Sequence, residues 1–141
     1  MSSKPENNFI AAVHRKFEDG AKPYFEKMHN PYRGGTWDVW YSGKKRGRKA
    51  SQDLWVEYKW LPQIPKRETT LILPELSALQ IGWGANRYDE GRNVWVILGC
   101  PDGGVIYRDL AWEEALPPSL FRSMLLTKQQ LASAISEFTM P

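Results

Sequence analysis

The sequence predicts an α/β fold in which helices flank a central mixed β-sheet. Two runs rich in Trp, Val and Tyr, at residues 36–41 and 53–60, have the composition of β-strands. The near-continuous apolar run at residues 93–100 is typical of a strand buried on both faces. Apolar residues at helical spacing precede the first run and separate the second from the third, so helices and strands are interleaved.

The first helix is predicted at residues 5–17, where large apolar side chains recur at helical spacing: Phe9, Ile10, Val13 and Phe17. Pro5 suits the first turn, because the N–H groups of that turn have no partner inside the helix. Glu6 precedes Ile10 by four positions, so its side chain projects from the end of the apolar stripe. Residues 24–28 are predicted to form a short strand.

The two aromatic strands are predicted to be joined by a long hairpin connection at residues 42–52, which contains Ser42, Gly43 and Gly47. Residues 61–74 are predicted to be irregular, because prolines interrupt them repeatedly. A second helix is predicted at residues 75–90, with one face formed by Leu76, Leu79, Trp83 and Arg87. Gly82 and Gly84 weaken this helix, since glycine is a poor helix former.

A short edge strand is predicted after the buried run, where "DGG" turns into "VIY". A third helix follows the Pro117-Pro118 break, and Thr127 with Gln130 has the spacing of a capping box. Its apolar face consists of Leu131, Ala134, Ile135 and Phe138. This face is expected either to close the core or to contact a partner subunit.

The composition indicates one globular domain of 141 residues. A net charge of +3 is only mildly basic, so the placement of the charges matters more than their sum. Cys100 is the single cysteine, which fits a reducing interior and a buried structural thiol. Since no apolar run approaches the length of a membrane span, we expect a soluble cytoplasmic protein that contacts no membrane.

Charged residues occupy positions inside the aromatic strands. Side chains in a strand alternate between its two faces, so Glu57 and Lys59 share one face of the second strand, and Leu54, Val56, Tyr58 and Trp60 share the other. Asp38 lies on the first strand and meets Glu57 and Lys59 if the two strands pair. Two neighbouring carboxylates repel each other, so a cation is expected between them.

A hard divalent cation fits this pair of acids. Mg²⁺ prefers oxygen ligands and binds through one or two carboxylates together with a substrate phosphate. Lys59 would then face the scissile phosphate or a water molecule, and would stabilise developing negative charge. The pattern therefore indicates hydrolysis of a phosphodiester bond.

One spacing in the sequence resembles the D…ExK core of the PD-(D/E)xK nuclease superfamily: Asp38 is followed, after a gap of 18 residues, by Glu57-Tyr58-Lys59. The helix with Glu6 resembles the superfamily's first helix, and "LSALQIGW" resembles the helix after the ExK strand in VRR-NUC-like and junction-resolvase-like members. The likeness covers residues 6–107 and leaves residues 108–141 as a C-terminal helical extension. Trp37 stands where the superfamily name has Pro.

The resemblance implies a restriction-endonuclease-like fold with an α-β-β-β-α-β core, and a metal-dependent endonuclease similar to small phage enzymes. It implies that Asp38, Glu57 and the backbone carbonyl of Tyr58 ligate Mg²⁺ or Mn²⁺, and that Lys59 orients the attacking water. Glu6 would bind a second ion or water, and Gln80 would support the site. It also implies branched DNA such as a Holliday junction as substrate, a homodimer, no small-molecule organic cofactor, and the host cytoplasm as location.

A basic segment lies between the two site strands and is expected to contact the phosphates of DNA. Its charged residues are Lys44, Lys45, Arg46, Arg48 and Lys49. Arg33, Lys66 and Arg67 are candidates to extend this surface. Solvated charge at a loop tip and a chance likeness to a localisation signal are the alternatives for the segment.

Several alternatives stay open at this stage. Glu57 and Lys59 are also compatible with a solvated sheet face, Glu6 with a favourable helix-dipole position, and Gln80 with a local capping role. Most of the tryptophans are expected in the core, and no catalytic role is assigned to either histidine, His14 or His29. A non-catalytic nucleic-acid-binding module, or a phage protein that inhibits a host factor, is the alternative function.

Overall fold

The computed structural model describes residues 3–29, 34–43 and 51–141. A five-stranded sheet has the order β1-β2-β3-β4-β5, in which only β3 and β4 are parallel. The strands are β1 (Tyr24–Lys27), β2 (Val39–Ser42), β3 (Asp53–Trp60), β4 (Val94–Cys100) and β5 (Gly103–Arg108). The predicted mixed sheet is therefore confirmed, with β4 buried along its whole length and β5 at an edge.

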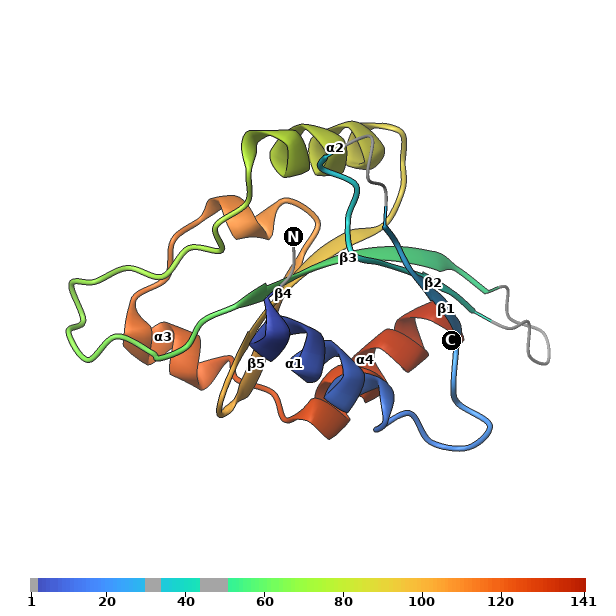
Figure 1. The fold of residues 1–141 in the computed structure, drawn as a ribbon, viewed down its shortest axis with the longest axis horizontal. Helices are drawn as coiled ribbons and strands as arrows, with labels where there is room; N and C mark the ends of the chain where they lie inside the picture. Colours follow the sequence, from blue (N-terminus) through green and yellow to red (C-terminus); the bar gives the residue numbers. More distant parts are fainter. Residues whose placement is uncertain (1–2, 30–33, 44–50) are drawn as a thin grey trace.

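Helices cover both faces of the sheet (Figure 1). They are α1 (Lys4–His14), α2 (Ala78–Asp89), α3 (Pro118–Ser123), α4 (Lys128–Thr139) and the 3₁₀ turn η1 (Ala111–Glu113). Helix α2 lies over one face, and α1 and α4 lie side by side under the other (Figure 1). The parallel pairing of β3 with β4 requires a crossover, and α2 lies within that connection.

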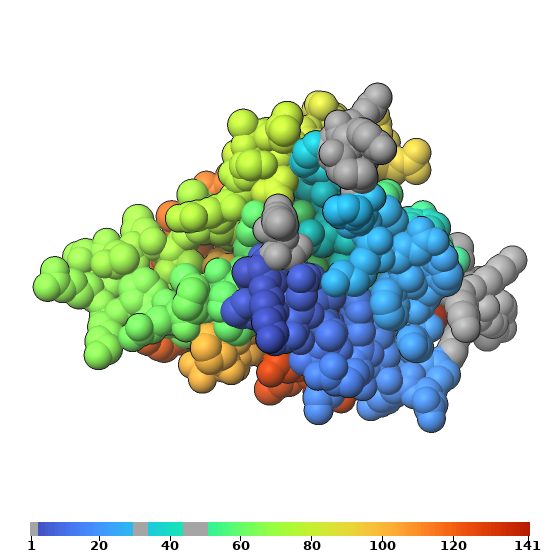
Figure 2. All heavy atoms as spheres, in the orientation of Figure 1, coloured from blue at the N-terminus to red at the C-terminus, as the bar shows by residue number. Residues whose placement is uncertain are grey.

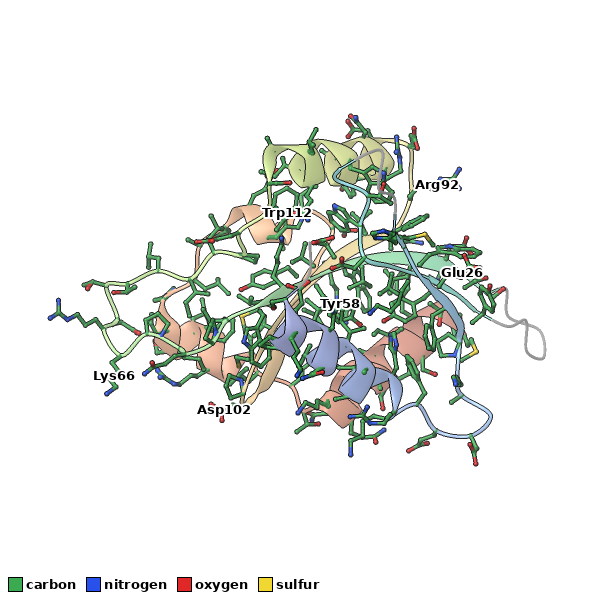
Figure 3. The ribbon with its side chains drawn as sticks, in the orientation of Figure 1. Glu26, Tyr58, Lys66, Arg92, Asp102 and Trp112 are labelled. Atoms are coloured by element: carbon green, nitrogen blue, oxygen red, sulfur yellow. The ribbon has the colours of Figure 1, made fainter. Side chains whose placement is uncertain are left out.

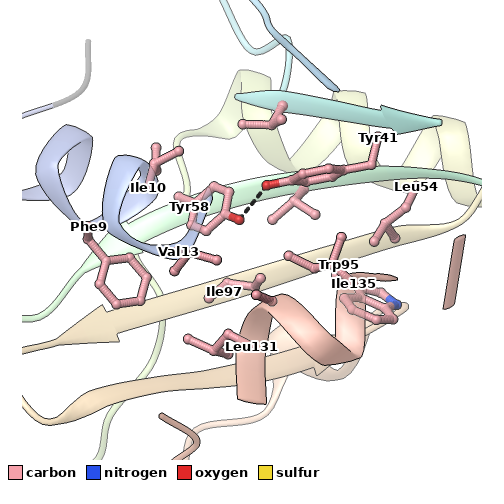
Figure 4. Packing of buried hydrophobic residues seen from close by; sticks show 13 residues of the cluster. Phe9, Ile10, Val13, Tyr41, Leu54, Tyr58, Trp95, Ile97, Leu131 and Ile135 are labelled. Atoms are coloured by element: carbon pink, nitrogen blue, oxygen red, sulfur yellow. Dashed lines mark hydrogen bonds between the residues drawn. The ribbon is translucent and has the colours of Figure 1, made fainter. Parts of the chain in front are cut away.

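The core consists of two clusters, one on each face of the sheet. The lower cluster packs α1 and α4 against β3 and β4 through Phe9, Tyr58, Ile97 and Leu131, among others (Figure 4). The upper cluster contains Trp37, Val96, Trp112 and Phe121. Since Leu131, Ala132 and Ile135 belong to the lower cluster, α4 closes the core of the domain.

Several predicted boundaries were wrong. Helix α1 ends at His14 rather than residue 17, and α2 begins at Ala78, after the Ser77 N-cap, rather than at residue 75. Leu79 was predicted to share one face of α2 with Trp83 and Arg87, and its side chain is 64% exposed. The C-terminal region contains the short α3 before α4, whose predicted capping box of Thr127 and Gln130 is present.

Gly84 is explained by a close approach between α2 and the sheet. A Cβ atom at Gly84 would lie 2.1 Å from Cζ2 of the fully buried Trp37, whereas a Cβ atom at Gly82 would meet nothing within 4 Å. Only one of the two glycines is therefore required by packing.

Residues 61–74 form an arm that carries no helix or strand and projects from the body of the protein (Figure 2). The arm is tied to the C-terminal region, since Ile72 and Leu116 form a β-bridge and Glu68 accepts a hydrogen bond from the Ser119 N–H. No helix formed by the described residues has the length and apolar content needed to cross a membrane.

A buried hydrogen-bond chain supports β3 from below. The Tyr41 and Tyr58 hydroxyl groups lie 2.6 Å apart (Figure 4), and His14 Nε2 lies 2.7 Å from the Tyr41 hydroxyl. Burial, followed by the charges of Lys27 and Lys22, lowers the pKa of His14 from 6.5 to about 4. This histidine is therefore neutral in the folded protein at pH 7.

We predict that Gly84→Ala lowers the free energy of unfolding by about 1 to 3 kcal/mol, because the new methyl group overlaps the Trp37 ring. Gly82→Ala is the matched control, and we expect it to raise that free energy by about 0.5 to 1 kcal/mol through helix propensity. Urea denaturation of both variants measures the difference. Equal effects of the two substitutions would contradict the packing argument.

We predict that His14 destabilises the fold in acid. The folded-state pKa is below the unfolded value, so the unfolded chain binds the proton first and stability is lost as the pH falls from 6.5 towards 4. The loss attributable to His14 should reach about 3 kcal/mol. Urea denaturation of His14→Gln across this range should show a smaller loss than wild type.

The control for this experiment is His29→Gln, which removes an exposed histidine. Its stability profile should overlay that of wild type. A His14→Gln profile that also overlays wild type would show that His14 is not the titrating group.

Candidate active site

Strand β3 carries the centre of the site on its upper face. Val56 and Tyr58 pack into the lower cluster, so the alternation of the strand turns Glu57 and Lys59 towards α2. The Glu57 side chain is 1% exposed, and the Lys59 side chain is 21% exposed. The alternative of a solvated sheet face therefore does not apply to Glu57.

The two carboxyl oxygens of Glu57 have different surroundings. Gln80 Nε2 donates a hydrogen bond of 2.9 Å to Oε2, and Lys59 Nζ lies 3.6 Å from the same oxygen. Oε1 is buried and accepts no hydrogen bond from an N–H or O–H group of the described residues. A buried oxygen that accepts no hydrogen bond is costly when the group is ionised, which makes Oε1 a candidate ligand atom.

The pKa of Glu57 is raised from 4.5 to about 9, first by burial and then by the negative charge of Asp38. Lys59 opposes this shift, and the charge of Glu6 adds to it. The carboxyl group therefore holds a proton at pH 7 unless a cation takes the proton's place.

Asp38 reaches the site from the bend before β2. It was predicted inside a strand at residues 36–41, but β2 begins at Val39. The Asp38 side chain takes the place of a strand partner: its Oδ2 accepts a hydrogen bond of 2.9 Å from the Tyr58 N–H. Burial raises the pKa of Asp38, whereas the Tyr58 N–H, the Lys59 charge and a side-chain hydrogen bond with Glu57 lower it. The structure thus brings Asp38, Glu57 and Lys59 together.

Gln80 has two roles in the structure. It completes the capping box of α2, because its Oε1 accepts a hydrogen bond of 2.9 Å from the Ser77 N–H. Its Nε2 meanwhile donates to Glu57. The capping role and the site role considered for Gln80 are therefore compatible.

An open cleft of about 620 Å³ borders the site, and Glu6 and Lys59 both line it. Leu73, at the end of the arm, and Glu75, directly after the arm, line the same cleft. Glu75 was not anticipated from the sequence, because no periodic pattern covers the proline-rich segment before it. The cleft gives a substrate access to Lys59.

The residues at the centre fit a divalent cation. Among residues 3–29, 34–43 and 51–141, no group of three or more His, Cys, Asp or Glu side chains is arranged to hold a metal ion, so Glu6 does not complete a three-acid cluster. Mg²⁺ commonly uses only one or two carboxylates and takes other ligands from water and phosphate. The neighbouring carboxyl groups of Asp38 and Glu57 provide such a donor set, because Oε1 of Glu57 accepts no hydrogen bond from the described residues.

The residues predicted to bind nucleic acid are only partly described. Lys66 and Arg67 are exposed on the arm, and Lys66 projects away from the body (Figure 3). The other predicted residues lie outside the described residues. They are Arg33 and the basic segment between β2 and β3, which contains Lys44, Lys45, Arg46, Arg48 and Lys49.

Trp37 helps to position Gln80 and Asp38. It was not identified from the sequence as a site residue. Its Nε1–H donates a hydrogen bond of 2.9 Å to the Gln80 carbonyl oxygen, and it directly precedes Asp38. The signal in the sequence was Gly84, since a glycine inside a helix often marks a close packing contact. The sequence does not say which side chain makes that contact.

Comparison with solved structures identifies a protein of the same fold. The chain superposes on Hjc of Archaeoglobus fulgidus, described as a Holliday junction resolvase from an archaeal hyperthermophile, with a TM-score of 0.50 and 14% identity. The match covers 90% of this chain and 99% of Hjc. The chain therefore has the restriction-endonuclease-like fold that this resolvase also has. No protein-family profile and no curated protein matches the sequence.

We predict that Glu57→Gln raises the free energy of unfolding in metal-free buffer by about 1 to 2 kcal/mol. The amide is neutral at every pH, so folding no longer requires the uptake of a proton beside Asp38, and the amide oxygen still accepts a hydrogen bond from Gln80. Because the folded pKa of Glu57 is raised, its contribution to stability is full below pH 4.5 and is lost as the pH rises towards 9. The gain should therefore be larger at pH 8 than at pH 5.

Urea denaturation in the presence of a chelator measures this gain. Glu90→Gln is the control, since Glu90 pairs with Arg87 on the surface and should contribute less than about 0.5 kcal/mol. A loss of stability in Glu57→Gln at pH 8 would show that the ionised carboxylate is favourable in the metal-free fold.

Proposed function

We propose that the protein is a metal-dependent endonuclease that hydrolyses phosphodiester bonds in DNA. The observation that carries the proposal is the buried Glu57 carboxyl group, which lies beside Asp38 and Lys59 and has one oxygen that accepts no hydrogen bond from the described residues. The fold shared with a junction resolvase supports the same reaction class.

Asp38 and Glu57, with the backbone carbonyl of Tyr58, would hold Mg²⁺ or Mn²⁺. Such an ion activates water and neutralises the charge of the phosphoryl oxygens when it is bound. Glu6 would add negative charge at the cleft and support a second ion or a water molecule. The pKa of Glu57, raised by burial and by Asp38, fits a carboxyl group that ionises when a cation is present.

Lys59 would act on the phosphate and the attacking water. Its ammonium group is partly exposed in the cleft and stands 3.6 Å from Glu57 Oε2, so it can contact a substrate while it stays paired. A fixed positive charge there stabilises the negative charge that develops as the phosphodiester bond is attacked. Gln80 would act as a positioning residue, because its hydrogen bond holds Oε2 and fixes the orientation of the carboxyl group.

Basic residues would bind the DNA backbone outside the catalytic centre. Lys66 and Arg67 on the arm are candidates, together with Arg33 and the basic segment at residues 44–49. Each phosphate contact would make the affinity depend more steeply on salt concentration.

Branched DNA is the substrate we propose, by analogy with the resolvase of the same fold. Cutting two strands of a junction needs two active sites, so we propose a homodimer with one site in each subunit. The similarity of the sequence motifs to small phage endonucleases suggests a phage-encoded enzyme that acts in the host cytoplasm.

We predict that the wild-type protein cuts DNA only when Mg²⁺ or Mn²⁺ is added, and cuts four-way junctions faster than linear, supercoiled or single-stranded DNA. Lys59→Ala and Glu57→Ala should lower the cleavage rate by roughly 100-fold or more, because they remove charge stabilisation and the cation site. Gel assays of cleavage, with DNA binding measured separately in a chelator, separate chemistry from affinity.

Lys16→Ala removes an exposed lysine after α1 and serves as the control, with wild-type cleavage expected. If wild type and Lys59→Ala bind DNA equally and neither cuts it under any metal condition, the protein is a non-catalytic binding module. If the wild type neither binds nor cuts DNA, the alternative of a host-factor inhibitor is favoured.

A further inference from the structure

Trp40 lies outside both core clusters although it is one of the largest side chains in the sheet. It is paired with Trp55 across β2 and β3, so both rings lie on the α2 face, 6.3 Å apart between centroids and tilted by 33°. Both rings are partly buried, but Trp55 packs against the upper cluster, whereas Trp40 contacts Trp55 and the exposed Tyr24. Trp40 is thus an aromatic surface that the core does not use.

An open pocket of about 610 Å³ lies beside these two rings. It is formed by the start of β3 and by the turn that joins α2 to β4, with Gln52, Asp53, Gly91, Arg92 and Asn93 completing its wall. Asp53 and Arg92 are its charged residues.

The Trp40 ring is held in place before any ligand binds. Its Nε1–H donates a hydrogen bond of 3.0 Å to Asp53 Oδ2. Asn93 Nδ2 in turn donates a hydrogen bond of 3.0 Å to the Asp53 carbonyl oxygen, which ties the turn to β3. A preorganised aromatic wall lowers the entropy cost of binding a flat ligand.

The chemistry of the pocket fits a nucleotide. Indole rings stack on nucleobases with little dependence on base identity. Arg92 is exposed and points outward from the turn after α2 (Figure 3), where a guanidinium group can pair with a phosphate. The combination of aromatic rings with a cation is the one that binds single-stranded nucleic acid.

The pocket lies within a few nucleotides of the catalytic centre. Trp55 precedes Glu57 by two residues on the same face of β3, which corresponds to about 7 Å. The far wall at Gly91 lies just beyond the end of α2, whose nine residue steps from Gln80 to Asp89 (89 − 80) span about 14 Å. At the duplex rise of about 3.4 Å per nucleotide, this range corresponds to roughly two to four nucleotides.

We propose that the pocket between Trp40, Trp55 and Arg92 binds an unpaired nucleobase of the DNA that the protein cuts. A base inside a paired duplex is stacked and cannot enter the pocket, so occupation of the pocket favours substrates with single-stranded or branched segments. This inference rests on the proposed nuclease function and adds the determinant of its substrate choice.

The test compares Trp40→Ala, Trp40→Phe and Arg92→Ala with wild type. Dissociation constants are measured in a chelator by fluorescence anisotropy, with a thymidine oligomer of about twelve nucleotides and a blunt duplex of the same length. Trp40→Ala should weaken binding of the oligomer roughly 5- to 100-fold and change duplex binding little, and Trp40→Phe should retain most of the affinity. Arg92→Ala should reduce the slope of log affinity for the oligomer against log salt concentration by about one, which corresponds to the loss of one phosphate contact.

Arg15→Ala is the matched control, because Arg15 is exposed after α1, which covers the opposite face of the sheet. If Trp40→Ala binds the oligomer with wild-type affinity, the pocket proposal is wrong, and the cleavage assay still tests the nuclease proposal separately. If Trp40→Ala loses oligomer binding but the wild-type protein cuts no DNA, the pocket proposal is supported and the nuclease proposal is rejected.

Discussion

The burial of the Glu57 carboxyl group is the constraint around which the rest of the site is arranged. Removing a carboxylate from water costs several kcal/mol, and a well-packed apolar side chain at the same position is often more stable. Gln80 and Lys59 both face Oε2, whereas the charge of Asp38 disfavours ionisation of Glu57 and Oε1 accepts no hydrogen bond from the described residues. Such surroundings are poor for stability and suitable for binding a cation, which is why we assign Glu57 a functional role.

The packing of α2 against Trp37 holds this arrangement together. Gly84 allows the helix to approach the Trp37 ring, and the Trp37 indole then binds the carbonyl of Gln80. The same contact therefore fixes the first turn of α2, which supplies the amide to Glu57, and the segment that leads into Asp38. From below, the hydroxyl of Tyr58 is held by Tyr41. Strand β3 is thus supported on both faces at the residues that form the site.

The parts of the structure that the sequence predicts well are those set by local periodicity. Strand β3 has the predicted bounds, and period-two alternation correctly separated Glu57 and Lys59 from the apolar face. The errors arose where tertiary contacts decide. Asp38 lies outside β2 because its side chain, rather than its backbone, binds the Tyr58 N–H. Leu79 is exposed because the approach at Gly84 sets which side of α2 faces the sheet. Composition alone likewise cannot separate the partly exposed Trp40 from the tryptophans of the core.

The aromatic residues on the upper face connect the pocket to the candidate active site. Trp40 is followed by Trp55, Trp83 and Trp37, with centroid distances of 6.3, 5.0 and 5.8 Å between successive rings. The row ends at the hydrogen bond from Trp37 to Gln80, whose side chain binds Glu57. Packed rings on a strand and a helix hold their positions more accurately than a loop does. A base stacked on Trp40 would therefore lie at a set distance from Glu57, so the pocket would select the position of the cut as well as the form of the DNA.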